Sequence, residues 1–446
     1  MDKSAWWRHW MPREGRPLES IIEELDEALK QCIDYRSQPI LGFPGTTPCE
    51  IALGVHHRVA VRQLNNLGYH TKDDPSEMGF LGTQKLERNF IYAVAEMLGV
   101  KNPPAEIDGY ICGGGTESND HGLWIARNKL WDDVKIRAPQ RRGIVVLRSF
   151  LFHYSIEKAF SRLLGRDLAE DEAVRNISRE LPTNERGELE LRTLAGEIRY
   201  FYMIGYRRFA VFLTAGTANM GSIDPVYEIC EGLERLQKEY VGIGVRVHVD
   251  AAFGGFIVPF IEPDCHFAFQ HPLVSSVSID AHKFGGLPYP AGIFLCRKGL
   301  LDSTSTDAWY IYGHTDNTVP GSRSGAIAAA AWASLQSRGW AGFEKTARSC
   351  MEVRNYLQER LQAMPGMHVY PSRVNILTIR PPAYLERGLE ELWEKYRIVR
   401  DHFPGRLTNP GYRGNLVKRD ATVYRFTIMP HVMREHINRF FQEWQR

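Results

Sequence analysis

Two short apolar runs in the stretch from Val245 to Arg297 each lead into an ionisable residue. The run VRVHV is followed by Asp250, and the run SSVSI is followed, within DAHK, by Lys283. Short buried runs separated by helical patterns are typical of βαβ units with parallel strands. The residues that follow such strands meet at one edge of the sheet, where ligands bind. This stretch therefore favours an open α/β sheet with a site at the carboxyl ends of its strands.

The same arrangement recurs earlier in the chain. Apolar runs at 144–147 and 209–213 predict two further strands, because both are short and bounded by polar residues. His153 lies shortly after the first of these runs, and Thr214 and Thr217 follow the second. We expect these side chains to reach the same edge of the sheet as the two ionisable residues.

A glycine-rich loop joins another predicted strand to a helix. The run at 109–112 leads into Gly113–Asn119, with the sequence GGGTESN, and apolar residues then recur at helical spacing. Such a loop presents unpaired backbone N–H groups and the positive end of the helix dipole to an anion such as phosphate. A glycine triplet alone is equally compatible with a plain turn.

The remaining patterns divide the chain into three parts. At 446 residues, it exceeds one average domain. Helical spacing of apolar residues and short strand-like runs recur in these stretches: 21–32, 81–98, 326–335, 350–361 and 433–444 for helices, and 373–379 and 422–428 for strands. We predict the following boundaries: an N-terminal arm and helix over 1–55, a large domain over 56–325, and a small C-terminal α/β domain over 326–446.

Composition excludes several classes of protein. Hydrophobic residues make up 43% and charged residues 24% of the chain, so a sizeable core is expected. The formal net charge is +2 without a basic block, which argues against binding to nucleic acid or a membrane surface. No run is long enough to span a membrane. Seven scattered cysteines without a CxxC pair predict no disulfide framework and no metal site, and favour a soluble protein of the cytoplasm.

The predicted edge carries the groups that pyridoxal 5'-phosphate requires of a protein. A carboxylate at Asp250 would stabilise the protonated ring nitrogen, and a partly desolvated amine at Lys283 would form an imine with the cofactor. His153 could stack on the ring, and His282 with Ser278 could bind the phosphate. Each residue alone has a commoner explanation, namely a capping aspartate, a surface lysine or a core histidine. Their occurrence together at successive strand ends favours the cofactor.

Several motifs then resemble a known family. They are QLNNLGY (63–69), GGTESN (114–119), FHYSIEKA (152–159), TAGTANMGSIDP (214–225), HVDAAFGGFIVPFIE (248–262), SIDAHKFGGLPYPAG (278–292), TVPGSRSG (318–325) and IMPHV (428–432). On these motifs the chain resembles the group II pyridoxal phosphate-dependent amino-acid decarboxylases of fold-type I. It looks most like the bacterial histidine, plant serine and archaeal tyrosine/aspartate decarboxylases. The similarity runs from about Leu41 to the end of the chain.

The resemblance implies a fold and a set of residue roles. The fold would be an aspartate aminotransferase-like large domain with a mostly parallel sheet, an N-terminal helical segment and a small C-terminal α/β domain. Lys283 would be the Schiff-base lysine and Asp250 the partner of the pyridinium nitrogen. Ala252 would lie beneath the ring, His153 above it and Thr217 near it.

The resemblance also implies phosphate ligands and a shared site. Those expected on the phosphate are Gly115, Thr116, Glu117, Ser118, Ser278 and His282. Because active sites of this family lie at a homodimer interface, Ser322 and Arg323 would reach the phosphate of the neighbouring subunit. A mobile loop would supply a tyrosine that protonates the carbanion; Tyr312 fits best, with Tyr310 and His314 nearby.

The expected reaction is decarboxylation of an L-amino acid to the amine and carbon dioxide, through a Lys283 aldimine and a quinonoid intermediate. Three alternatives remain at this stage: a carbon–carbon lyase of the sphingosine phosphate lyase kind, a decarboxylation-dependent oxidative deaminase, and a non-catalytic scaffold. The motif DAHK stands where histidine and serine decarboxylases usually have SGHK, which leaves the substrate open.

Overall fold

The computed structural model describes residues 14–72, 78–136, 140–165, 175–310, 315–413 and 415–444. The chain divides into two compact units, Met1–Pro39 and Ile40–Arg446. The first unit contains α2 (Leu18–Leu29), which confirms the helix predicted from the N-terminal apolar spacing. The other elements of the described residues belong to the second unit. The domain boundaries at 55/56 and 325/326, which the sequence indicated, remain a prediction.

A seven-stranded sheet forms the centre of the second unit, with the strand order β1-β7-β6-β5-β4-β2-β3. Neighbours from β6 to β3 are parallel, whereas β7 is antiparallel to both β1 and β6. This mostly parallel sheet confirms the predicted α/β fold. Its strands are β1 (Ile107–Cys112), β2 (Ile144–Ser149), β3 (Ile177–Leu181), β4 (Arg208–Thr214), β5 (Gly244–Asp250), β6 (Val274–Asp280) and β7 (Gly292–Arg297).

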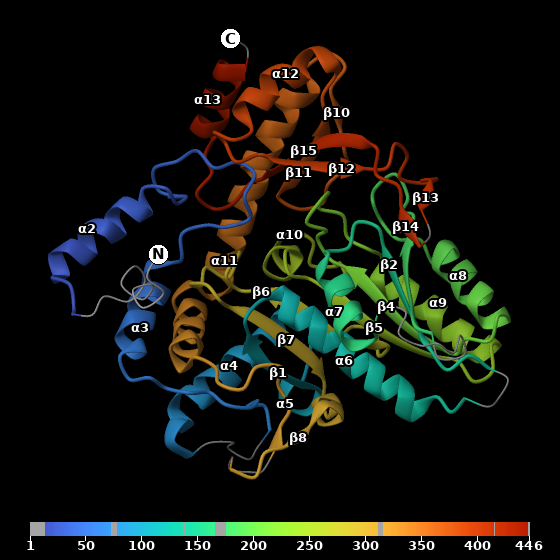
Figure 1. The fold of residues 1–446 in the computed structure, drawn as a ribbon. Coiled ribbons are helices and arrows are strands. Elements are labelled where there is room, and N and C mark those ends of the chain that lie inside the picture. Colours follow the sequence, from blue (N-terminus) through green and yellow to red (C-terminus); the bar gives the residue numbers. More distant parts are fainter. Residues whose placement is uncertain are drawn as a thin grey trace, which may run out of the picture. The chain divides into compact units, whose positions relative to one another are not determined.

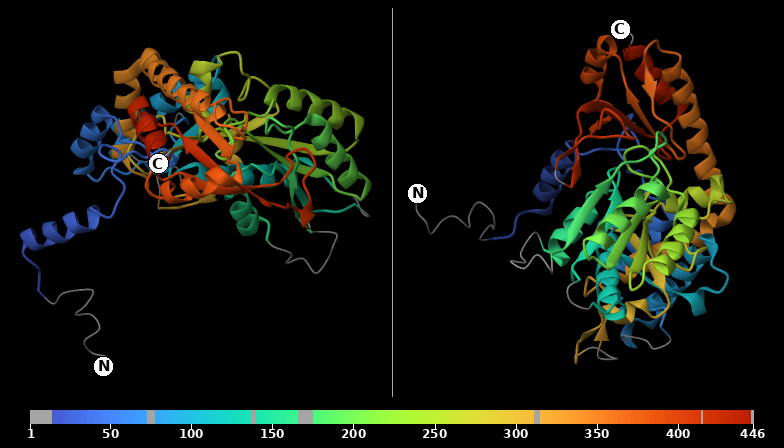
Figure 2. Two further views of the ribbon diagram at one scale, coloured as in Figure 1. Left: turned by 90° about the horizontal axis from the view of Figure 1, so that it is seen from above. Right: turned by 90° about the vertical axis from the view of Figure 1, so that its right-hand side faces the viewer.

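Helices cover both faces of this sheet (Figures 1 and 2). They include α6 (Gly115–Asp133), α7 (Ser155–Leu163), α8 (Leu191–Met203) and α9 (Val226–Glu239). Successive residues of β2 show the two faces, because Val146 packs in the core shared with α6 and α7 while Val145 packs in the core shared with α8 and α9. A strand buried on both faces has a continuous apolar run rather than an alternating one. This is the pattern seen in the sequence.

A four-stranded antiparallel sheet lies toward the C-terminus, in the order β10-β11-β15-β12. Its strands are β10 (His368–Val369), β11 (Ile376–Arg380), β12 (Val399–Phe403) and β15 (Ala421–Thr427). The same part of the chain forms the helices α12 (Ala383–Leu392) and α13 (Arg434–Trp444). The helix α11 (Gly325–Gln362) connects the two sheets, with one non-helical residue at Gly339. It contributes Phe343 to the core of the large sheet and Leu357 to the core of the small one. The backbone kink at Gly339 divides α11 into two helices, which confirms the two helices predicted in this region.

The described residues form these further elements: α3 (Glu50–Ala60), α4 (Leu81–Met97), α5 (Pro103–Glu106), α10 (Val258–Ile261), 3-10 helices at Met78–Phe80, Gly254–Phe256 and Leu300–Thr304, and the strand pairs β8 (Thr306–Asp307) with β9 (Thr315–Asp316) and β13 (Tyr412–Arg413) with β14 (Leu416–Val417). Within the described ranges, every helix is too short or too polar to cross a lipid bilayer.

Candidate active site

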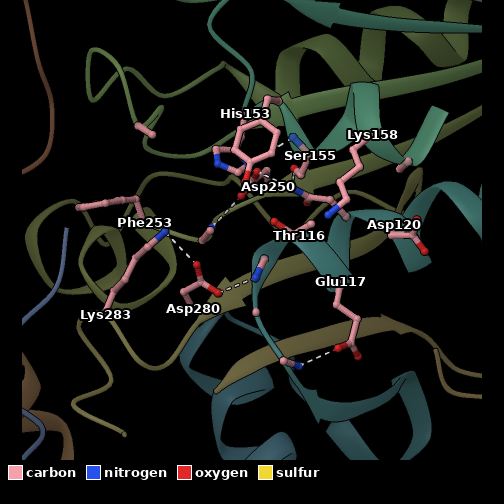
Figure 3. Close-up of a pocket in the computed structure, with 18 of the residues that line it drawn as sticks. Thr116, Glu117, Asp120, His153, Ser155, Lys158, Asp250, Phe253, Asp280 and Lys283 are labelled. Atoms are coloured by element: carbon pink, nitrogen blue, oxygen red, sulfur yellow. Dashed lines mark hydrogen bonds and ion pairs between the residues drawn. The ribbon is translucent and has the colours of Figure 1, made fainter. Parts of the chain in front are cut away.

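A cavity of about 570 Å³ opens at the carboxyl ends of the strands in the large sheet (Figure 3). Segments that end or follow five of the strands supply much of its walls. Gly113–Gly115 follow β1, His153 follows β2, Thr214 ends β4, Asp250 ends β5 and Lys283 follows β6. The parallel topology therefore brings together groups that lie far apart in the sequence.

The carboxylate of Asp250 is held in a network of buried hydrogen bonds. Its Oδ2 accepts from the Asn119 side-chain amide at 2.7 Å. Its Oδ1 accepts from the Ala252 backbone N–H at 2.9 Å and from the Ser278 hydroxyl at 3.3 Å. Because these donors come from α6, β6 and the loop after β5, the carboxylate has one fixed position on the cavity wall. It is suited to hold a cationic ring nitrogen.

A second layer of polar groups fixes Asn119. Its Oδ1 accepts from the Ser278 hydroxyl at 2.8 Å and from His248 Nε2 at 2.9 Å. An amide oxygen can only accept, so His248 carries its proton on Nε2, and its Nδ1 accepts from the Ser276 hydroxyl at 2.8 Å. Burial lowers the pKa of His248 to about 3, so this ring is neutral. Neither Asn119 nor His248 was predicted as a site residue.

Buried neutral histidines make the stability of the fold pH-dependent. Burial also lowers the pKa of His121 to about 3, from the ordinary value of 6.5. Between about pH 3 and pH 6.5 the unfolded chain binds more protons than the folded chain. The contribution of these histidines to the free energy of unfolding is therefore complete above pH 6.5 and decreases as the pH falls. Each histidine contributes a loss of up to about 1.4 kcal/mol per pH unit. Urea unfolding midpoints at several pH values measure this slope. His248→Gln should flatten the slope, and an unchanged slope in that variant would contradict the assignment.

The amine of Lys283 lies beside a second buried carboxylate. Its Nζ is 2.8 Å from Asp280 Oδ2 and 4.9 Å from the centroid of the Phe253 ring. Figure 3 shows this amine pointing to Asp280. Asp280 Oδ1 also accepts from the Gly115 backbone N–H at 2.6 Å, at the start of α6. Burial tends to raise the pKa of Asp280, but Lys283 and then His282 more than offset it, and the pKa is lowered.

His153 presents a neutral imidazole to the cavity. Burial is the largest cause that lowers its pKa, and the nearby charges of Lys283 and Arg425 lower it further. The ring Nδ1 accepts from the Ser155 backbone N–H at 3.3 Å. The orientation of the ring is fixed by this bond and by the Tyr154 ring, whose centroid lies 4.3 Å away.

Three hydroxyl groups predicted near the cofactor form hydrogen bonds within the fold instead. Ser118 is fully buried and donates to the Ile293 carbonyl at 3.1 Å. The Thr217 hydroxyl shares a hydrogen bond of 2.8 Å with Ser222, and Ser278 bonds to the network beneath the cavity wall. None of these three residues lines the cavity. The side chain of each points into the surrounding fold, which the motif alone does not reveal.

The residues predicted at a subunit interface have different surroundings. The Arg323 guanidinium pairs with the buried carboxylate of Glu87 and donates to the Ile111 carbonyl at 3.0 Å, so its hydrogen-bonding capacity is largely used within the chain. Ser322 is exposed and lies outside the cavity lining. Tyr312 lies outside the described residues, and the nearby Tyr310 is 92% exposed.

The residues of the cavity fit pyridoxal phosphate. The N-terminus of α6 faces the cavity, and a Cβ atom at Gly115 would come within 3.1 Å of the Ala252 Cβ, so glycine leaves room there. The Thr214 hydroxyl on the cavity wall is buried without a hydrogen-bond partner in the described part of the chain. The Lys283 amine and the Asp250 carboxylate complete the set. Within the same described ranges, no group of three His, Cys, Asp or Glu residues is placed to hold a metal.

A second cavity of about 540 Å³ adjoins the first and shares His153, Phe253 and Lys283 with it. Its outer wall includes Arg425, whose strand β15 belongs to the small sheet. On this strand Tyr424 and Phe426 point into the small core, so Arg425 faces the opposite way. The sequence analysis missed this arginine, although the alternation in ATVYRFT was a signal that could have located it.

Comparison with known proteins gives consistent matches. Residues 66–377 match the family model described as the pyridoxal-dependent decarboxylase conserved domain. The chain is 31% identical over 418 residues to a tryptophan decarboxylase of Clostridium sporogenes, covering 91% of this chain and 92% of that protein. It is 29% identical over 441 residues to an L-aspartate decarboxylase of Thermococcus kodakarensis, covering 97% of each. A structure of L-methionine decarboxylase from Streptomyces sp. 590 superposes with a TM-score of 0.76 at 22% identity, covering 97% of this chain and 95% of that one.

Proposed function

Because the chain belongs to the pyridoxal-dependent decarboxylase family, we propose that the cavity at the strand ends holds the cofactor and is where the substrate reacts. The protein is a pyridoxal phosphate-dependent amino-acid decarboxylase. The observation that supports the location is the placement of Lys283 and Asp250 on one cavity, at the ends of the adjacent strands β6 and β5. The product would be the amine that corresponds to the L-amino acid substrate, together with carbon dioxide.

The lining residues have distinct proposed roles. Bound pyridoxal phosphate supplies an electron sink for the bonding pair left behind by carbon dioxide. Lys283 would provide the amine that attaches the cofactor, and Asp250 would hold the ring nitrogen in its protonated form. His153 would offer a flat neutral surface to the ring. Gly115, Thr116 and Glu117 line the cavity at the start of α6 and would hold the phosphate, together with His282.

Arg425 is the proposed ligand of the substrate α-carboxylate. The Arg425 guanidinium lies 3.8 Å from the carboxylate of Asp401. The Arg425 Nε is buried without a hydrogen-bond partner among the described residues. A guanidinium in this state gains two charge-assisted hydrogen bonds when a carboxylate binds. The shared cavity walls would bring that carboxylate beside Lys283, where decarboxylation requires it.

Arg425→Gln is expected to lower kcat/KM by about 10²-fold, because a buried guanidinium–carboxylate pair is lost. Steady-state release of carbon dioxide measures the effect. Arg380→Gln is the matched control, since this arginine is exposed at the end of the neighbouring strand β11. A loss below about threefold would place the α-carboxylate elsewhere.

The proposed substrate reaction is tested by incubating the holoprotein with each amino acid and identifying the amine and carbon dioxide by mass. The carbon–carbon lyase alternative is less supported, because the relatives by sequence are decarboxylases. It would require an aldehyde from a phosphorylated amino alcohol with no loss of carboxylate from any amino acid. Consumption of oxygen with formation of peroxide would identify an oxidative deaminase instead.

We further propose a cytoplasmic homodimer with shared sites. All seven cysteines are free, which fits a reducing compartment. The exposure of Ser322 leaves its hydroxyl accessible to a second subunit. Sedimentation of the purified protein at a mass near twice 51.0 kDa would support the dimer, and a monomer with full activity would exclude the shared site.

A further inference from the structure

We infer that the second cavity selects amino acids whose side chain carries no net charge. The inference rests on the proposed function, because it takes Arg425 as the site of the α-carboxylate. It concerns the part of the cavity beyond Arg425, where the substrate side chain would lie. The charged groups that line this part are Arg148, Glu157, Glu180 and Arg419.

These four groups neutralise one another. Arg148 on β2 is almost fully buried, and it lies 2.8 Å from a carboxylate oxygen of Glu157 and 3.4 Å from one of Glu180. Arg419 donates to the same Glu180 oxygen at 2.9 Å. Two guanidinium groups thus face two carboxylates at contact distance. Their charges sum to zero before any substrate enters.

The network is also fixed in place by the backbone. Glu180 accepts from the Val417 N–H at 2.8 Å, and Arg419 donates to the Phe150 carbonyl at 3.0 Å. Glu157 accepts from the Ser178 hydroxyl at 3.0 Å. Freeing one of these charges for a ligand would leave its partner desolvated and unpaired, which is costly in a buried site.

A charged side chain therefore has no counter-ion available in this part of the cavity. An aspartate side chain would need a second cation after Arg425 has bound the α-carboxylate. The charges of the other two lining arginines are already balanced by Glu157 and Glu180, although the Arg148 Nη1 has no hydrogen-bond partner among the described residues. Lys158 lines only the first cavity, on the side of Thr116 (Figure 3). A cationic side chain would in turn meet two arginines whose glutamates are engaged.

The uncharged part of the lining is largely apolar. Its apolar members are Pro44, Phe150, Phe152, Ala218, Phe253 and Leu416, and its polar members are His153, Tyr154, Asn219 and Thr427. Such a surface gains from contact with an aromatic or aliphatic side chain through burial of apolar area. The geometry thus points to neutral, mainly apolar amino acids, and away from the acidic and basic ones.

The test compares kcat/KM of the holoprotein for tryptophan, tyrosine, phenylalanine and leucine with that for aspartate, glutamate and lysine. The best uncharged substrate is expected to exceed every charged one by at least about 10²-fold, the scale of an unpaired buried charge. Preference for a charged amino acid would overturn the inference and leave the decarboxylase assignment intact. If no amino acid releases carbon dioxide, the proposed function itself has failed.

A matched pair of variants tests the role of the network. Glu180→Gln leaves Arg419 without a carboxylate, so the ratio of kcat/KM for aspartate to that for the best neutral substrate should rise at least about tenfold. Glu197→Gln is the control. It also removes a carboxylate from an arginine, Arg179, which lies on β3 beside Glu180, but Arg179 and Glu197 line a cavity other than the two described above. Equal ratios in the two variants would contradict the inference.

Binding measurements keep the test independent of turnover. Calorimetric titration of the wild-type holoprotein with tryptamine and with β-alanine compares an amine whose side chain is uncharged with one whose side chain is a carboxylate. Tryptamine is expected to bind at least about tenfold more tightly. Tighter binding of β-alanine would overturn the inference, even if Glu180→Gln fails to fold.

Discussion

Lys283→Ala is expected to lower kcat for decarboxylation by at least about 10³-fold, since the proposed covalent nucleophile of the site is lost. The Lys283 amine is largely buried between Asp280 and the Phe253 ring. Among the described residues that line either cavity, no other lysine amine is buried in this way. The variant should also lose covalent attachment of the cofactor. Borohydride reduction followed by peptide mass mapping measures attachment, and release of carbon dioxide measures turnover.

Lys238→Ala is the control for this variant, because that lysine is exposed near the end of α9. It should retain wild-type turnover and cofactor attachment. If reduction of wild-type protein labels a lysine other than Lys283, the assignment is wrong, whatever the effect of alanine on activity. A folded Lys283→Ala protein, checked by its circular dichroism and its thermal midpoint, is required for the comparison.

Asp250→Asn is expected to lower kcat by about 10²- to 10³-fold, because an amide cannot stabilise a protonated ring nitrogen as a carboxylate does. The substitution also disturbs the network. The new amide can accept from Asn119 through its oxygen, but its NH₂ group then faces the Ala252 N–H, which is itself a donor. Both effects act on the same wall of the cavity.

Steady-state kinetics and the absorption spectrum of the bound cofactor measure the Asp250→Asn effect together. The spectrum separates loss of cofactor from loss of the ring charge, since protein that retains the cofactor but has low turnover indicates the charge. Asp264→Asn, at an exposed loop position after α10, is the control. Turnover of Asp250→Asn within about threefold of the wild type would show that another group sets the ring charge.

Strand positions and strand-end residues were predictable because they depend on local pattern. Asp250 ends one short strand-like run and Lys283 follows another, and the structure places both on one cavity. The helix from Leu81 to Met97 was likewise visible in its apolar spacing. Such features need no knowledge of which distant segment lies opposite.

The partners of these residues were not predictable in this way. Asn119 meets Asp250 only because α6 packs across β5 and β6, which are more than a hundred residues later in the chain. Asp280 appeared in the sequence only as a difference within DAHK, and its contact with Gly115 depends on the order of strands in the sheet. Arg425 required the position of the small sheet. Hydrogen-bond partners of this kind are tertiary information.

The two helices of α11 were predictable from their separate apolar patterns, but the point where they meet was not. That point is Gly339, with φ 57° and ψ −175°, a backbone conformation that glycine adopts without strain. The second helix begins shortly after it, earlier than the apolar spacing from Cys350 onward indicated.

The second helix of α11, which follows Gly339, has a consequence for how the protein unfolds. Phe343 and Ala347 pack in the core of the large sheet, whereas Val353 and Leu357, a few turns further along the same helix, pack in the core of the small sheet. Melting either core would expose part of a helix on which the other depends. The two sheets are therefore thermodynamically coupled, so the loss of the small core would also loosen the wall that carries Lys283 and Asp250.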